Sequence, residues 1–337
     1  MVNLDFSNLK IGKKQQVGVM SVFPLIGEDV KTKLSSFEDI DFIGTDDYGE
    51  MVFKNNGEYP FMLPSGYSIM TKQQAQDHAL PLSTLLPAKE VRCIKEACCI
   101  EATMPGYIDG KKVKGFNMLP IYIRKRHLED FFKNYRKGSC FNLKNYSRLW
   151  EYIFDFQSKL IDSGREDLVL FFNKFMNELI KFNAEFEVVK GQRGAIILIN
   201  DKVIGIEVVP TQKYWKTIWN SLIRDCYGSE VIRLVKQNLI ENFKDYKECD
   251  IKLDDCKSIS EIRERLEDYY NNERKKIEKK LHLICKAMVN EVQGEDIIAL
   301  NSDKSLSYHI FKLFNKDVYG EVYQDNNNNV IYCSMLF

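Results

Sequence analysis

The uneven placement of prolines and glycines constrains this chain more than any other feature. All eight prolines lie at or before Pro210, and only three of the eighteen glycines, Gly228, Gly294 and Gly320, lie after it. Both residue types interrupt regular structure and favour turns. We therefore expect strands and turns before Pro210, and mostly helices after it.

Short apolar runs between turn residues predict strands in the first part. Residues 17–25 alternate apolar and small side chains up to a proline, which predicts a strand followed by a turn. Asn55-Asn56-Gly57 separates the apolar runs 51–53 and 59–63, and an Asn-Gly pair in this position predicts a hairpin. A further strand is expected over 91–101.

Helical spacing of apolar residues begins near residue 149 and continues to residue 182. Within this range, Ser163-x-x-Glu166 has the pattern of a capping box that begins the second of two helices. Ser258-x-x-Glu261 predicts in the same way the start of the longest helix. Between them, the helix that begins near residue 214 is expected to break at Gly228.

Strands return after the first helices, at 195–199 and 203–209, and again at 330–337. The regular alternation of strands and helices that is typical of a doubly wound sheet is missing. The sequence predicts an α+β fold, with a mixed, largely antiparallel sheet that is built from two batches of strands and packed with helices. We expect a single domain over 1–337, in which residues 244–292 form a helical elaboration around the long helix.

Composition excludes several classes of protein. The N-terminus has no basic segment followed by an apolar one, and no apolar run is long enough to cross a bilayer. The sequence therefore argues against a secretory signal and a membrane span. Nine cysteines without a C-x-x-C pair favour free thiols in the cytoplasm. Zinc-ligand spacings are missing too, so we expect neither a metal nor a cofactor.

Charge is balanced overall but not locally. The chain has 48 Lys+Arg and 48 Asp+Glu. It therefore lacks the strong basic excess that is expected of a dedicated nucleic-acid binder, and the sequence argues against nucleic acid as a partner. Residues 111–137 nevertheless contain nine basic and two acidic residues, interleaved with aromatic ones. A phosphate of one nucleotide needs only one or two such groups. A local anion site is therefore one interpretation of this stretch, and a solvated surface is the other.

Two polar segments are candidates for chemistry. Residues 72–78 follow a turn at Gly66 and end in the pair Asp77-His78, and a histidine beside an aspartate can act as a general base. The alternative is an exposed polar loop. Glu101 follows an apolar stretch, so burial would raise the pKa of its carboxyl group, unless Glu101 is the first exposed residue after a strand.

Seven segments are similar in order and spacing to the motifs of one known family. They are Val19–Leu25, Gly66 with Gln76-Asp77-His78-Ala79, Cys99-Ile100-Glu101, Leu119-Pro120 with Arg124, Leu149-Trp150-Glu151, Gly194–Asn200 with Trp219 and Tyr227, and Val330–Phe337. Together they resemble the ARG-and-rhodanese-phosphatase-superfamily-associated protein domain, where ARG denotes ADP-ribosylglycohydrolase. The resemblance spans nearly the whole chain. His78 stands where the family has arginine, and Tyr332 where histidine is common.

The resemblance implies nucleotide or ADP-ribose chemistry close to this chain. Our first hypothesis is a cytoplasmic protein of bacterial stress or defence that binds or senses a small nucleotide-like or ADP-ribose-type ligand. Gln76, Asp77, His78, Glu101 and Arg124 would line its site. Arg124 would hold a phosphate, and Gln76 and Glu101 would hydrogen-bond the ribose or the base.

The alternative hypothesis is a hydrolase that acts on an ADP-ribosyl or phosphate-containing nucleotide substrate. Glu101 or Asp77 would then activate water, and His78 would act as an acid or a base. A third interpretation is an interaction protein that forms a homo-oligomer through its aromatic helices. The sequence leaves the choice between an enzyme and a binding protein open.

Overall fold

The computed structural model describes residues 6, 8–31, 33–45, 47–71, 75–102, 105–113, 115–136, 146–162, 164–240, 256–289, 293–299, 307–314 and 317–337. The helical elements are η1 (Phe37–Asp39), η2 (Gly110–Lys112), α1 (Ile121–Arg136), α2 (Tyr146–Gln157), α3 (Leu168–Ala184), α4 (Gln212–Asn220), the π-helix η3 (Ser221–Gly228), α5 (Ser229–Lys236) and α6 (Ile259–Val289). Strands β1–β9 are Lys10–Ile11, Gln15–Val17, Met20–Ile26, Ile40–Gly44, Met51–Asn55, Phe61–Leu63, Tyr67–Ile69, His78–Ala79 and Thr84–Leu86. Strands β10–β18 are Val91–Ile94, Cys98–Cys99, Asn117–Met118, Gln192–Ile199, Lys202–Val208, Gln293–Ala299, Ser307–Phe314, Tyr319–Gln324 and Val330–Leu336.

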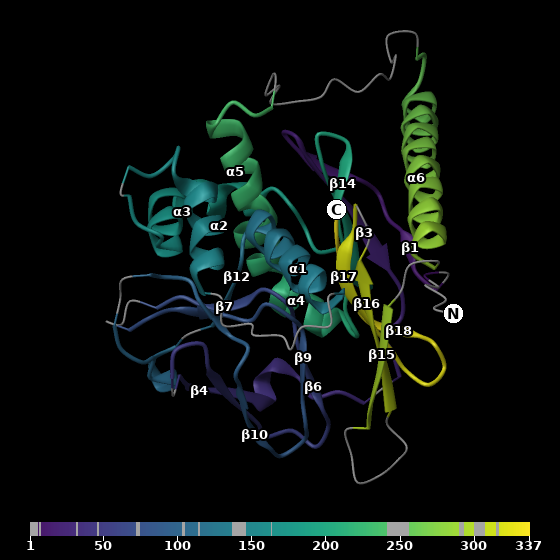
Figure 1. The fold of residues 1–337 in the computed structure, drawn as a ribbon. Coiled ribbons are helices and arrows are strands. Elements are labelled where there is room, and N and C mark those ends of the chain that lie inside the picture. Colours follow the sequence, from purple (N-terminus) through teal and green to yellow (C-terminus); the bar gives the residue numbers. More distant parts are fainter. Residues whose placement is uncertain are drawn as a thin grey trace.

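A nine-stranded sheet joins the two ends of the chain (Figure 1). Its order is β1-β3-β13-β14-β18-β17-β16-β15, with β2 paired to β3, and every pairing between described strands is antiparallel. Strands β13 and β18 are buried along their whole length. Their continuous apolar runs suit strands that are covered on both faces, so they lie inside the sheet.

The two faces of this sheet belong to different cores. On β3, Met20 and Val22 face a large core that also contains Trp215 of α4. Phe23 and Leu25 alternate with them and face a second core that contains Ile277 of α6. Side chains of a strand alternate between its faces, so the sheet separates α6 from the other helices, as Figure 1 shows.

The predicted hairpin at 51–63 is wrong in its pairing. Both strands form, as β5 and β6, but β5 pairs with β4 and β10, whereas β6 pairs with β9. The side-chain amide of Asn55 donates to the carbonyl oxygens of Tyr59 and Leu86, 2.8 and 3.2 Å away. Asn55 thus links this turn to β9, the strand that pairs with β6. The strand expected over 91–101 likewise divides into β10 and β11, which lie in different sheets.

Two of the three predicted helix boundaries need correction. The side chain of Asp167 caps α3 by accepting from Val169 N, whereas Ser163 lies outside the described residues. The predicted break at Gly228 is wrong, because α4, η3 and α5 follow one another and Gly228 has helical φ and ψ angles of −61° and −37°. The predicted start of α6 is confirmed, because Glu261 N donates to Ser258 Oγ at 3.2 Å.

The expectation of mostly helices after Pro210 is wrong for the C-terminal part. Four strands, β15–β18, follow α6, and only the last was predicted. A scarcity of proline and glycine removes helix breakers but does not exclude strands, which their neighbours stabilise. The turn between β17 and β18 is stabilised by Asp325 and not by proline or glycine. The Asp325 carboxylate accepts hydrogen bonds from the backbone N–H groups of Asn327 and Asn329 at 2.9 Å.

The α+β class is confirmed, with helices on both faces of an antiparallel sheet. Among the described helices, none is both long and apolar enough to cross a membrane. The single domain over 1–337 and the helical elaboration at 244–292 stay predictions. Of the latter range, α6 is described, and residues 244–255 and 290–292 lie outside the described residues.

Candidate functional site

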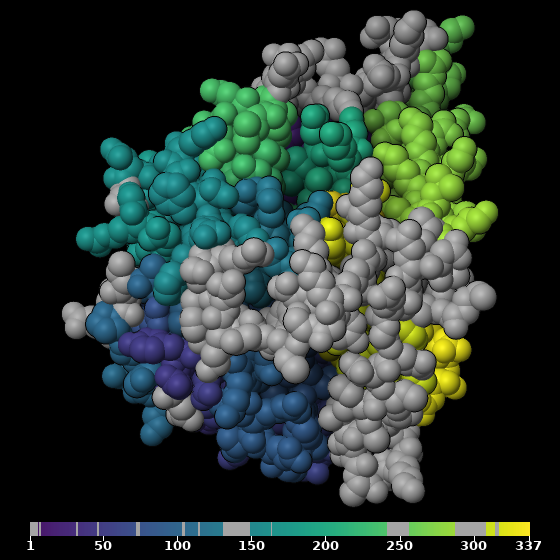
Figure 2. Space-filling view, in the orientation of Figure 1, coloured from purple at the N-terminus to yellow at the C-terminus, as the bar shows by residue number. Residues whose placement is uncertain are grey.

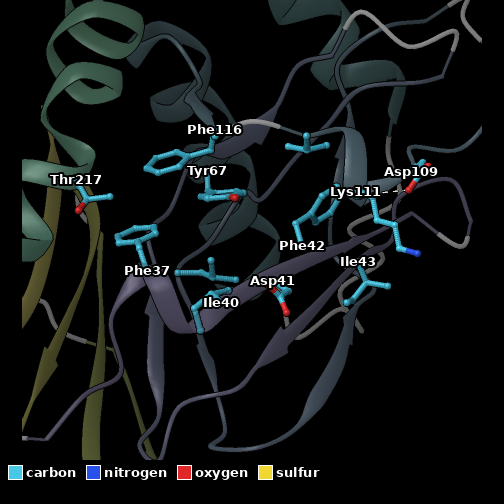
Figure 3. A pocket seen from close by; sticks show the side chains of 14 residues that line it. Phe37, Ile40, Asp41, Phe42, Ile43, Tyr67, Asp109, Lys111, Phe116 and Thr217 are labelled. Carbon is cyan, nitrogen blue, oxygen red and sulfur yellow. Dashed lines mark hydrogen bonds between the residues drawn. The ribbon is translucent and has the colours of Figure 1, made fainter.

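A cavity of about 640 Å³ opens between β4, η2 and the segment that leads into β12 (Figure 3). Four aromatic side chains from three parts of the chain line it: Phe37 and Phe42, Tyr67, and Phe116. The other lining residues include Ile40, Ile43, Asp41, Asp109, Lys111 and Thr217. A cavity of this size, apolar with a few polar groups, is typical of small-molecule sites.

The rings on one side of the cavity form an ordered stack. The Phe116 ring lies parallel to that of Phe37, with centroids 5.2 Å apart, and is also stacked on Tyr67 at 4.7 Å. Figure 3 shows Phe42 across from these rings and Lys111 farther out. Gly110 allows η2 to pack closely against β4, because a Cβ atom there would lie 2.1 Å from the carbonyl oxygen of Phe42.

The charged side chains at the rim differ in whether they already have a hydrogen-bond or ion-pair partner. Asp109 Oδ1 accepts from Lys111 N at 3.1 Å, and its other oxygen lies 3.5 Å from Lys112 Nζ. Asp41 accepts from the side-chain amide of Asn56 at 2.8 Å. The Lys111 ammonium group, in contrast, makes no ion pair with any described residue. Lys111 is the first residue of the basic stretch 111–137, so one positive charge of that stretch borders the cavity.

A separate cluster of carboxylates gathers where three elements begin or end. Asp77 directly precedes β8, Glu101 follows β11, and Asp167 caps α3. Glu101 and Asp167 form a β-bridge, and Ile100 N donates to Asp77 O at 3.0 Å. Within the described ranges, no group of three or more His, Cys, Asp or Glu side chains could hold a metal ion.

Burial dominates the electrostatics of this cluster. It raises the pKa of Asp77 to about 8, with hydrogen bonds from Thr71 opposing the shift and the charge of Glu101 adding to it. Burial, and then the charge of Asp167, raises the pKa of Glu101 to about 7. The pKa of Asp167 is also raised by burial. Near neutral pH, these carboxyl groups can therefore differ in protonation.

Gln76 and His78 are buried next to these carboxylates and hydrogen-bond the backbone around them. The Gln76 amide donates to the carbonyl oxygen of Glu101 at 2.6 Å, and its own Oε1 is buried without a partner among the residues that the structure describes. His78 is fully buried, with Nδ1 2.8 Å from Gln76 O and Nε2 accepting from Gly49 N at 2.9 Å. Nε2 is therefore the acceptor and Nδ1 carries the proton. Burial lowers the pKa of His78 to about 4, which argues against a role as acid or base.

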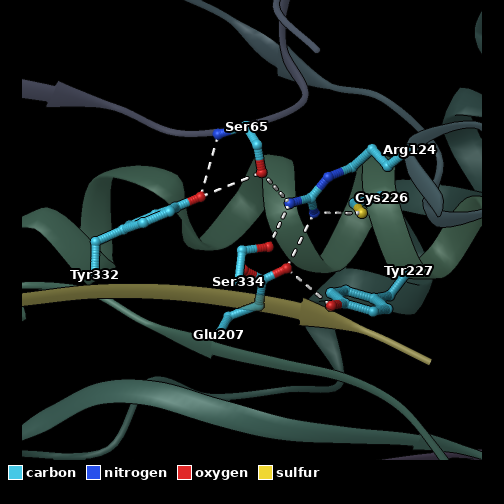
Figure 4. Close-up of polar contacts among 7 residues, drawn as sticks. All are labelled: Ser65, Arg124, Glu207, Cys226, Tyr227, Tyr332 and Ser334. Atoms are coloured by element: carbon cyan, nitrogen blue, oxygen red, sulfur yellow. Dashed lines mark hydrogen bonds and ion pairs between the residues drawn. The ribbon is translucent and has the colours of Figure 1, made fainter. Parts of the chain in front are cut away.

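Arg124 lies elsewhere, in a buried polar network (Figure 4). Its Nη1 donates to Glu207 Oε1 at 3.0 Å, and its Nη2 to the hydroxyl oxygens of Ser65 and Ser334 at 2.9 Å. Arg124 is 2% exposed. It makes no hydrogen bond or ion pair with Gln76, Asp77 or Glu101. These contacts argue against the expected role in binding a phosphate.

The structure thus divides the five predicted site residues into two groups. Gln76, Asp77, His78 and Glu101 come together, whereas Arg124 does not join them. The sequence analysis missed Asp167 and the aromatic residues of the cavity. Asp167 directly precedes an apolar helical stretch, which is the usual signal of an N-cap, but the Ser163-x-x-Glu166 pattern predicts a helix start four residues earlier. The aromatic residues give no local signal, because only the fold brings them together.

Gly66 → Ala tests the packing around Arg124. Gly66 has a φ of +77°, and a Cβ atom would lie 2.6 Å from Arg124 Cδ. We expect the substitution to lower the free energy of unfolding by about 1–2 kcal/mol through the positive φ and by about 1–3 kcal/mol more through overpacking. Gly164 → Ala is the control in urea denaturation, because Gly164 has a φ of +61° and open space around it. Equal losses in both variants would contradict the packing argument.

Asp77 → Asn tests the buried carboxyl group. Native Asp77, with a pKa of about 8, keeps its proton at pH values where the unfolded chain, with a pKa near 3.9, has lost it. The free energy of unfolding should therefore fall as the pH rises from about 4 to about 8. The asparagine, which can still accept from Thr71, should flatten this slope in urea denaturation at stepped pH values. Asp155 → Asn, at an exposed position of α2, should leave the slope unchanged; an unchanged slope in both variants would contradict the assignment.

Comparison with known proteins places these features in a family. A family model described as ARG and Rhodanese-Phosphatase-superfamily-associated Protein domain matches residues 8–281. The matched range contains the aromatic cavity, the carboxylate cluster, Arg124 and most of α6. The comparison with curated proteins found no match, and neither did the comparison with solved structures. The chain belongs to the ARG and Rhodanese-Phosphatase-superfamily-associated Protein domain family.

Proposed function

We propose that this protein binds or senses a nucleotide or ADP-ribose-type ligand, and that the ligand occupies the aromatic cavity. The observation that carries the proposal is the combination of a 640 Å³ cavity, four aromatic side chains and a lysine at the rim. The family description adds a context of ADP-ribosylglycohydrolases and phosphatases. The cytoplasmic location, the role in stress or defence, and a homo-oligomer stay predictions.

Each part of such a ligand has a matching group in the cavity. A base would stack on the aromatic rings that line the cavity, and base–aromatic stacking contributes about 1–3 kcal/mol. The Lys111 ammonium group attracts phosphates at the rim. Carboxylate oxygens of Asp41 or Asp109 can accept hydrogen bonds from ribose hydroxyl groups. This site differs from the one expected from sequence, where Arg124 was to hold the phosphate.

Isothermal titration with ADP-ribose, NAD and AMP tests this proposal. We expect binding of at least one of them, with affinity reduced about tenfold in Lys111 → Ala, because a charge-assisted hydrogen bond contributes roughly 1.5–3 kcal/mol. Phe116 → Leu should also weaken binding by removing the stack while keeping an apolar side chain. The control is Lys95 → Ala, which changes an exposed lysine outside the cavity. If no nucleotide gives heat, or if Lys95 → Ala weakens binding as much, the proposal fails.

A second candidate function is hydrolysis of an ADP-ribosyl or phosphate-containing nucleotide substrate. It is favoured by the pKa values of about 7 for Glu101 and about 8 for Asp77. General acids and bases work best when their pKa lies near the working pH, and pairs of carboxyl groups in different environments are a common way to achieve this. Asp77 or Glu101 would activate water, and the neighbouring group would hold the proton.

The variant Glu101 → Gln tests the hydrolase. It keeps the shape of the side chain and cannot act as a base, so turnover should fall at least a hundredfold while the melting temperature stays within a few degrees. The substrates are a panel of ADP-ribosyl and phosphate esters, with and without Mg²⁺. The matched control is Glu96 → Gln, at an exposed position before β11. Lack of product from the whole panel with the unmodified protein would rule out this second function.

A further inference from the structure

A second cavity, of about 420 Å³, lies between α6 and the sheet. It is on the sheet face opposite to the aromatic cavity, because its floor residues Phe23, Leu198 and Ile277 belong to the core that faces α6. The two cavities share no lining residue. Helix α6 stands exposed at the edge of the molecule in Figure 2. Nothing in the proposed nucleotide function uses this region.

The floor of this cavity is apolar except for one hydroxyl group. Phe23, Leu198 and Ile277 are 2%, 4% and 4% exposed. Ser21 lies two residues before Phe23 on β3 and directly opposite Leu198 on β13, so its side chain faces α6 as theirs do. It lines the cavity and is 4% exposed. Its hydroxyl group makes no hydrogen bond with any described residue.

The Ser21 hydroxyl group is the one polar group on this otherwise apolar floor. It borders the cavity, so a molecule bound there can reach it. Ser21 therefore offers a donor toward the cavity that the described part of the protein does not use. This observation is independent of the charges around the rim.

The rim is basic. Its charged residues are Lys14, Lys276, Lys279 and Lys280 against Glu273 and Asp201. Lys14 and Lys276 lie 3.4 and 3.0 Å from Glu273, so this carboxylate is shared.

The other two lysines that line the cavity, Lys279 and Lys280, have fewer nearby negative charges. Among the described residues, Lys280 Nζ donates to the backbone oxygen of Asp201 alone, at 3.2 Å, and Lys279 forms no ion pair. They lie three and four residues after Lys276, so these charges share one helix face with the cavity. Two positive charges are thus available next to the Ser21 hydroxyl and an apolar floor.

We propose that this cavity binds an anionic amphiphile, a small molecule with an apolar body and one phosphate or carboxylate group. The apolar body packs on Phe23, Leu198 and Ile277. The anion lies between Lys279 and Lys280 and accepts the hydrogen bond of Ser21. A cavity of 420 Å³ falls within the range of about 300–1,000 Å³ that small ligands occupy.

Isothermal titration of the full chain with four probes tests this inference. They are n-octyl phosphate, octanoate, inorganic phosphate and the uncharged octyl glucoside, each below its micelle concentration. We expect one of the two anionic amphiphiles to bind at least tenfold more tightly than inorganic phosphate and octyl glucoside. The tighter of the two identifies the anion. Binding of neither amphiphile, or equal binding of octyl glucoside, would overturn the proposal.

Variants locate the binding. The double variant Lys279 → Glu/Lys280 → Glu should weaken amphiphile binding at least tenfold. Its control is Lys275 → Glu/Lys286 → Glu, which reverses two exposed charges of α6 away from the cavity. Ser21 → Ala, which removes only the hydroxyl group, should weaken binding about threefold or more without lowering the melting temperature. Equal loss in the two double variants, or full affinity in Ser21 → Ala, would contradict the assigned site.

Discussion

The buried ion pair between Arg124 and Glu207 holds the separate parts of this fold together. Arg124 comes from α1, Glu207 from β14, and both are almost fully buried. Desolvation of two charges costs several kcal/mol each unless further hydrogen bonds satisfy them. Here Ser65, Ser334 and the Tyr227 hydroxyl supply such bonds to the Arg124 Nη atoms and to Glu207, whereas Arg124 Nε is buried without a partner among the described residues. Removal of one partner would leave the other charge buried and unpaired, a loss of about 3–5 kcal/mol.

The π-helix η3 supplies two polar side chains to this network, those of Cys226 and Tyr227. Asp225, Cys226 and Tyr227 follow one another and are all buried. In an α-helix, three consecutive side chains point in directions about 100° apart, whereas the wider turn of a π-helix brings more of them toward one side. Cys226 Sγ then accepts from Arg124 Nη1 at 3.2 Å, and Tyr227 donates to Glu207 Oε1 at 2.9 Å. The π-helix thus supplies hydrogen-bond partners to both members of the ion pair between Arg124 and Glu207.

The two candidate sites are linked by the segment 105–112. Gly106 O accepts from Gln76 N at 3.1 Å on the side of the carboxylate cluster. A few residues later, Asp109 and Lys111 line the aromatic cavity. A ligand that contacts this rim therefore touches the same segment that supports Gln76. The geometry is compatible with binding in one site and chemistry in the other, and it connects the two functional hypotheses physically.

The sequence by itself determined the features that depend on near neighbours. These include the α+β class, the start of α6 at the Ser258 cap, the closing strand β18 and the family motifs around Gly66 and Glu101. Capping, turn formation and alternation act over a few residues, so they can be read along the chain. Even the association of Gln76, Asp77 and Glu101 was predictable, because the motifs indicated one site.

Only the tertiary structure decided which distant groups meet. It paired β5 with β4 and β10 instead of β6, buried Arg124 against Glu207, and assembled the aromatic cavity from separate segments. It also added Asp167 to the carboxylates. The reason is that strand pairing and burial depend on which surfaces exclude water together, and this depends on the whole chain at once. A motif identifies a residue as important, but the dielectric and the partners around it decide whether it binds a ligand or holds the core.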